Sequence, residues 1–98
     1  MGKVYVAGVG FTKIAEHWEK SLEQLMAEAA IQASESARLP AVNAIYIGNM
    51  LGEILQEQGH LGSLIAEYLG LSRVPAFRVE AAEASGAAAL YAGMLDIL

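Results

Sequence analysis

The chain has 98 residues, a net charge of −5, 55% hydrophobic residues and only 17% charged residues. This composition excludes an intrinsically disordered chain, which is poor in hydrophobic residues and rich in charge. The six lysine and arginine residues form no basic run, so nucleic acid is not an expected partner. The length suits one small domain.

Further classes of protein are excluded by features that the sequence lacks. No uncharged apolar run approaches the roughly 18 residues of a membrane span, and the opening MGKVYVAGVGFTK is too short and too strand-like for a signal peptide. We therefore expect a cytoplasmic protein with no membrane span. Because the 98 residues include no cysteine, they offer no disulfide, no thiolate metal ligand and no thiol nucleophile.

The first half of the chain predicts a strand, a helix and a second strand. Residues 3–9 (KVYVAGV) are rich in β-branched and aromatic side chains, which favours a strand. Ser21 is a candidate N-cap for a helix over residues 21–37, where apolar side chains recur at helical spacing. Pro40 is expected to end that helix, and residues 42–48 (VNAIYIG) predict a strand with both faces covered.

The second half predicts a loop followed by a helix, a strand and a last helix. The loop takes residues 49–60, and the short helix over residues 61–69 closes at Gly70. A third strand is expected over residues 74–81. The last segment, residues 85–98, is apolar on nearly every side, as is typical of a helix buried between layers.

The resulting order, β-α-β-α-β-α, predicts an α/β fold with a mostly parallel sheet and right-handed crossovers. This is half of a doubly wound domain. The last residues, 96–98, stop without a helix-closing signal, so we expect a truncated domain. Its apolar last helix should leave an exposed patch larger than the roughly 300–600 Å² usual for a monomer. A partner chain, a second copy or further sequence should cover that patch.

Three possible sites are weak on inspection. Gly8-Val9-Gly10 follows the first predicted strand like a dinucleotide fingerprint, but Lys13 stands where the third glycine belongs. His17 and His60 are far apart in sequence and lack metal-ligand spacing, so we expect no metal site and place both on the surface or in loops. Trp18 is interpreted as a hydrophobic staple onto the following helix, with anchoring of a coenzyme or subunit as the alternative.

The stretch VEAAEASGAAAL, residues 79–90, carries the candidate site. Two carboxylates, Glu80 and Glu83, stand in a small, apolar run where the third strand should meet the last helix. Ser85 is expected to cap that helix, and Gly86 is expected to allow close approach of a neighbouring layer.

This stretch resembles the nucleophile motif of the thiolases, in which a cysteine occupies the position of Glu83. Other segments resemble, in the same order, the N-terminal part of archaeal and sterol-carrier-type thiolases, the family of acetyl-CoA acetyltransferases. They are VAGVGFTK, EHWEKSL, IYIGNMLGE, GHLGSLIAEYLGL and VPAFRVEAA. The resemblance covers essentially the whole chain.

The resemblance implies a fold and a reaction. Thiolases exchange acyl groups between coenzyme A thioesters through an acyl-cysteine, using a second cysteine and histidine motifs from a C-terminal half. Their two similar α/β halves stack in five layers and dimerise through the N-terminal half. Residues 1–98 are then expected to be a partial N-terminal domain without the second half, acting in lipid metabolism, with a coenzyme A thioester as the family substrate and no separate cofactor.

Glu83 changes what this chemistry permits. A strand-to-helix turn presents its residue outward, and the helix N-terminus favours an anion there, which suits a thiolate. A backbone N–H at such a position also stabilises an oxyanion by about 3–4 kcal/mol in acyl transfer. Glu83 keeps that geometry but would have to form a reactive anhydride to carry an acyl group. We therefore expect no thiolysis from this chain alone.

Three interpretations of Glu83 stay open. It caps the last helix as a structural residue, or it fills the space of an acylated cysteine and holds an acyl-CoA ligand without covalent chemistry. The third is acid–base work with a partner chain, since a buried carboxyl group keeps its proton more readily. The chain is accordingly expected to be a thiolase-like component completed by a C-terminal half, or a non-catalytic docking domain that binds itself or a thiolase.

Overall fold

The computed structural model describes residues 2–38 and 41–98 and has six elements in the order α1, β1, α2, α3, β2, α4. The α/β class and the parallel sheet predicted above are confirmed. The chain divides into two compact units, Tyr5–Ala41 and Val42–Leu98, the latter with the first residues of the chain.

The first unit is an extended segment followed by helix α1, Leu22–Ala37. Ser21 is the N-cap, as predicted, and forms a capping box in which its hydroxyl accepts the Gln24 N–H and the Gln24 side chain accepts the Ser21 N–H. Arg38 ends the helix in the left-handed conformation. Pro40, the expected helix stop, lies outside the described residues.

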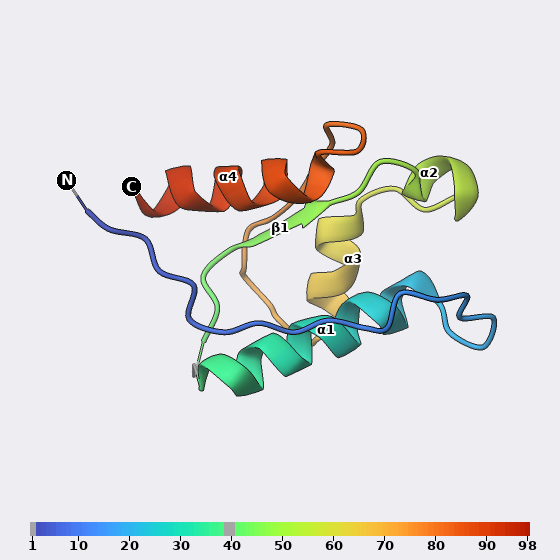
Figure 1. Cartoon of the computed structure of the whole chain (residues 1–98), viewed down its shortest axis with the longest axis horizontal. Helices are drawn as coiled ribbons and strands as arrows, with labels where there is room; N and C mark the ends of the chain where they lie inside the picture. Colours follow the sequence, from blue (N-terminus) through green and yellow to red (C-terminus); the bar gives the residue numbers. More distant parts are fainter. Residues whose placement is uncertain (1, 39–40) are drawn as a thin grey trace. The chain divides into compact units, whose positions relative to one another are not determined.

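The strand predicted over residues 3–9 is wrong, because the segment is extended but has no strand neighbour among the described residues. In the first unit it instead runs beside α1 (Figure 1). The Val9 N–H donates to Ser36 Oγ at 3.4 Å, and the Phe11 N–H donates to Gln32 Oε1 at 3.3 Å. Side chains of the helix thus satisfy backbone donors that a neighbouring strand would otherwise pair.

The second unit is built on two parallel strands, β1 (Ile45–Gly48) and β2 (Ala76–Val79), both shorter than predicted. The register pairs Ile45 with Ala76 and Gly48 with Val79. Helices α3 (Leu61–Tyr68) and α4 (Ser85–Ile97) lie on opposite faces of the sheet (Figure 1). This is the doubly covered arrangement that near-continuous apolar strands require.

The segment between β1 and α3 is not the plain loop predicted for residues 49–60, since it contains the one-turn helix α2, Gly52–Leu55. Its first N–H, from Gly52, donates to Asn49 Oδ1 at 2.6 Å. Asn49 stands before the N-cap residue Leu51, and its side chain satisfies a backbone donor of the first helical turn.

The core of the second unit is centred on α3. Leu61 and Ile65 are the largest fully buried side chains of the described residues. Helix and strand backbones touch here, because a Cβ at Gly62 would stand 2.7 Å from the Phe77 nitrogen. The helix ends as predicted at Gly70, whose φ of 72° suits glycine.

The other face of the sheet is tied to α4 through Tyr46. Its ring stacks on Phe77 with centroids 5.5 Å apart, and its hydroxyl donates to Asp96 Oδ2 at 3.0 Å. That hydrogen bond to a carboxylate raises the pKa of Tyr46 above its usual value.

Within the part of the chain that the structure describes, no helix has the length and apolar character needed to cross a bilayer.

Candidate functional site

The candidate site is the turn between β2 and α4, residues 80–84, which the sequence predicted at this place. The Glu80 carboxylate accepts the N–H of Ala82, and the Ala84 N–H donates to Ala81 O at 2.9 Å. Ala82 has a φ of 49°, a left-handed conformation that costs a residue with a side chain about 1–3 kcal/mol. The chain therefore reverses sharply between strand and helix, as the resemblance implied.

Ser85 closes this turn from inside. It is only 5% exposed, and its Oγ accepts the Ala81 N–H at 2.9 Å and donates to Ala82 O at 2.6 Å. Ser85 is thus the first residue of α4 and holds the preceding turn, whereas we predicted that it caps the helix. Because the hydroxyl satisfies one donor and one acceptor at once, its removal would leave the Ala81 N–H and the Ala82 carbonyl without this hydrogen-bond partner.

The carboxyl end of β1 abuts the first turn of α4. A Cβ built on Gly48 would stand 2.3 Å from Ser85 O and 2.8 Å from Gly86 Cα. A Cβ on Gly86 would meet nothing within 4 Å, so the close approach predicted for Gly86 is provided by Gly48. Only a glycine at position 48 lets strand and helix meet this closely.

Glu83 lies exposed on the outer side of the turn. The N-cap of α4 is Ala84, and no side chain donates or accepts a capping hydrogen bond there. The interpretation of Glu83 as a helix cap is therefore wrong for this structure. Acid–base work with a partner chain stays a prediction, because that interpretation takes its burial from the partner.

The weaker candidates of the first unit are explained by their local surroundings. Gly8 and Gly10 lie against α1, where a Cβ at Gly10 would stand 2.2 Å from Ala29 O, so close packing explains the glycine pair. Trp18 is 87% exposed, which makes the staple interpretation wrong. The Nε2 of His17 donates to Lys13 O at 2.7 Å in a loop.

His60 is exposed and directly precedes α3. Among the described residues, no three His, Cys, Asp or Glu side chains are grouped so that they could hold a metal ion.

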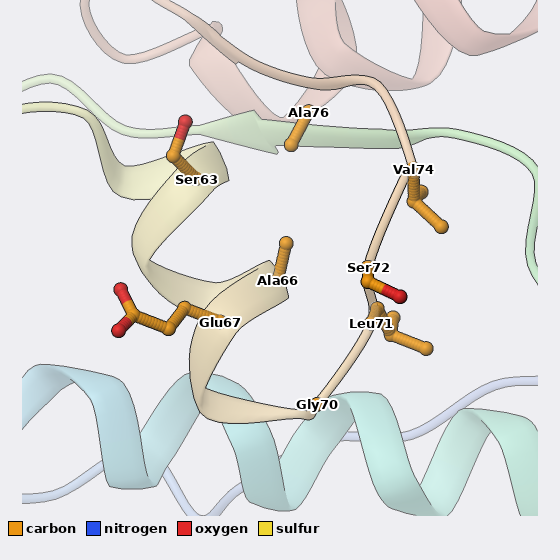
Figure 2. Close-up of a pocket in the computed structure, with 8 residues that line it drawn as sticks. All are labelled: Ser63, Ala66, Glu67, Gly70, Leu71, Ser72, Val74 and Ala76. Carbon is orange, nitrogen blue, oxygen red and sulfur yellow. The ribbon is translucent and has the colours of Figure 1, made fainter.

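Two hollows lie on the α3 side of β2. The larger, of about 460 Å³, is lined by α3 and by the segment that leads from Gly70 to Ala76. Figure 2 shows Ala66 and Ala76 facing this space while the Glu67 carboxylate points away from the opposing segment. Ser63, Glu67 and Ser72 are the polar side chains that line it.

The smaller hollow, of about 290 Å³, is lined by charged and polar side chains from α2, α3 and β2, including Glu53, His60, Ser63 and Arg78. Sequence analysis missed Arg78, because its neighbours come from positions 25 and 28 residues earlier in the chain.

Comparison with known proteins settles the ancestry. No protein-family model matches the chain. The chain is 41% identical to an acetyl-CoA acetyltransferase from Methanocaldococcus jannaschii, over 99% of this chain and 25% of that protein. The chain is related to the thiolases. It is also 40% identical to an acetyl-CoA acetyltransferase from Methanothermobacter thermautotrophicus, over 99% of this chain and 26% of that protein.

The chain therefore spans about a quarter of the length of these relatives. Because the alignments cover 99% of the chain, they include the residues of the β2–α4 turn. The resemblance read from the motifs is confirmed.

The contact between Gly48 and Ser85 makes a prediction about stability. Gly48→Ala places a methyl group inside the backbone of α4, so the free energy of unfolding should fall by about 1–3 kcal/mol. Gly86→Ala is the matched control, because its methyl group meets open space and alanine favours a helix by up to about 1 kcal/mol. Urea titration followed by circular dichroism measures both, and equal stability of the two variants would contradict the contact.

Proposed function

We propose that this chain is a thiolase-related module that keeps the turn of the nucleophile but does not transfer acyl groups by itself. The observation that carries the proposal is the exposed carboxylate of Glu83 on the tight β2–α4 turn of a sequence 40–41% identical to two acetyl-CoA acetyltransferases. Acyl transfer between coenzyme A thioesters belongs, in this proposal, to the larger thiolase assembly.

The chemistry of the carboxylate supports this division. A thiolate is a strong nucleophile, and the acyl-thioester that it forms is stable enough to be passed on. A carboxylate at the same place is a weaker nucleophile, and its acyl product is an anhydride that water destroys. The 98 residues contain no cysteine that could replace it.

The exposed position of Glu83 favours one of the open interpretations. Since the side chain neither caps α4 nor lies buried, it is free to occupy the space that an acylated cysteine would fill. We propose that an acyl-CoA ligand is held beside this turn without covalent chemistry, and that residues outside these 98 complete its binding.

A single thiol can test the turn, because the chain has no cysteine of its own. Glu83→Cys precedes the N-terminal end of α4, whereas Glu67→Cys lies at the C-terminal end of α3. The first variant should be alkylated by iodoacetamide at least about fivefold faster than the second. The N-terminal end of a helix lowers the pKa of a thiol and the C-terminal end raises it.

Neither wild type nor Glu83→Cys should cleave acetoacetyl-CoA, since the remaining catalytic groups of the family are not among these residues. Measurable cleavage by the variant would overturn the proposal. Equal alkylation rates would show that the turn does not activate its residue.

A second candidate function is docking, favoured by the apolar surface of α4. Leu90, Tyr91, Leu95 and Ile97 are each more than half exposed. Clustered apolar side chains of this kind mark interfaces. The expected partner is a second copy or a thiolase, and sedimentation analysis at micromolar concentration should show association. A stable monomer that also ignores a thiolase partner would exclude docking.

A further inference from the structure

We infer that the smaller hollow, lined by Glu53, His60, Ser63 and Arg78, binds the phosphate group of a small ligand. The inference goes beyond the proposed function, because it rests on the α3 face of β2 and needs nothing from Glu83. The hollow has a volume of about 290 Å³, at the small end of the roughly 300–1,000 Å³ of typical ligand sites. It suits a phosphate group better than a large molecule.

Arg78 is the group that points to an anion. Its side chain is only 22% exposed, and a guanidinium always carries its charge and five N–H donors. One terminal nitrogen donates to Met50 O at 3.2 Å, and the other lies 3.3 Å from Glu53 Oε1. The Nε atom is buried and has no hydrogen-bond partner among the described residues. Because Nε is buried, an additional acceptor can reach this largely buried cation only through its terminal nitrogens.

The ion pair with Glu53 is too weak to be that acceptor. It has one N···O contact of 3.3 Å rather than two parallel bonds, and the Glu53 side chain is 61% exposed. Single-contact pairs with one solvent-exposed partner contribute little to stability. Glu53 can therefore swing into solvent at little cost when a stronger oxyanion arrives. A phosphate could then engage the guanidinium through two oxygens.

Other donors line the same hollow. His60 and Ser63 contribute an imidazole and a hydroxyl, and α3 begins between them, at Leu61. The start of a helix favours negative charge, which adds to the attraction of Arg78. Donors that come from a strand, a loop and a helix suit the tetrahedral oxygens of phosphate better than the two coplanar oxygens of a carboxylate.

Glu53 then competes with phosphate for Arg78 and so lowers the affinity of the hollow for phosphate. Among the described residues it is the only carboxylate that lines the hollow, so its removal should strengthen binding of an anion while leaving Arg78 in place. A purely structural role of the Glu53–Arg78 pair predicts no such gain.

The test is a titration of the 98-residue chain with inorganic phosphate, followed by proton–nitrogen NMR at constant ionic strength with chloride as the balancing salt. The Arg78 Nε–H resonance and the Ser63 amide should shift saturably. Glu53→Gln should lower the dissociation constant at least about threefold, because it removes a repelling charge. Glu57→Gln, an equal change of charge outside the hollow, should leave the constant within about twofold of wild type.

Arg78→Lys should abolish the saturable shifts, because an ammonium cannot offer the planar fork. If this variant does not fold, the comparison of Glu53→Gln with Glu57→Gln still decides the question. Absence of saturable shifts, or no gain from Glu53→Gln, would overturn the inference. Acetate that binds as tightly as phosphate would overturn the assignment to a phosphate group.

Discussion

The geometry of the site depends on the two hydrogen bonds of the Ser85 hydroxyl. This hydroxyl joins the N–H of Ala81 to the carbonyl of Ala82 across the turn, and it is buried where α4 meets the end of β1. Gly48 makes that meeting possible, because any side chain there would overlap the Ser85 carbonyl. The left-handed conformation of Ala82 is maintained by these contacts, and the next residue is therefore turned outward.

A turn held in this way determines where residue 83 lies without determining what it does. The backbone would present a cysteine and a glutamate alike, so the family geometry can outlast the loss of the nucleophile. The resemblance implies that activity also needs groups from a C-terminal half, and the chain spans about a quarter of the length of its relatives. The 98 residues therefore establish the fold and the ancestry, whereas the activity, the ligand and the partners are proposed from them.

The sequence predicted correctly those helix ends that depend on residues close together in the chain. Ser21 with Gln24 marked the start of α1, and Gly70 marked the end of α3, since both signals act within a few residues. The strand expected over residues 3–9 was wrong, because a strand exists only when another strand pairs with it. Ser85 was identified but predicted to be a helix cap, because the sequence does not show that its hydroxyl bonds to the preceding turn. Arg78 was missed, because its hydrogen-bond partners lie 25 and 28 residues earlier in the chain.

If Glu83 stands at the nucleophile position and carries no acyl group, acetyl-CoA should leave the chain unmodified. The most direct measurement is the intact mass of the wild-type chain after incubation with acetyl-CoA, rapid acid quenching and hydroxylamine trapping. We expect the unmodified chain of 10.4 kDa, with no derivative at Glu83. An acetyl group or a hydroxamate located on Glu83 would contradict this expectation, since either would show that the carboxylate acts as the nucleophile.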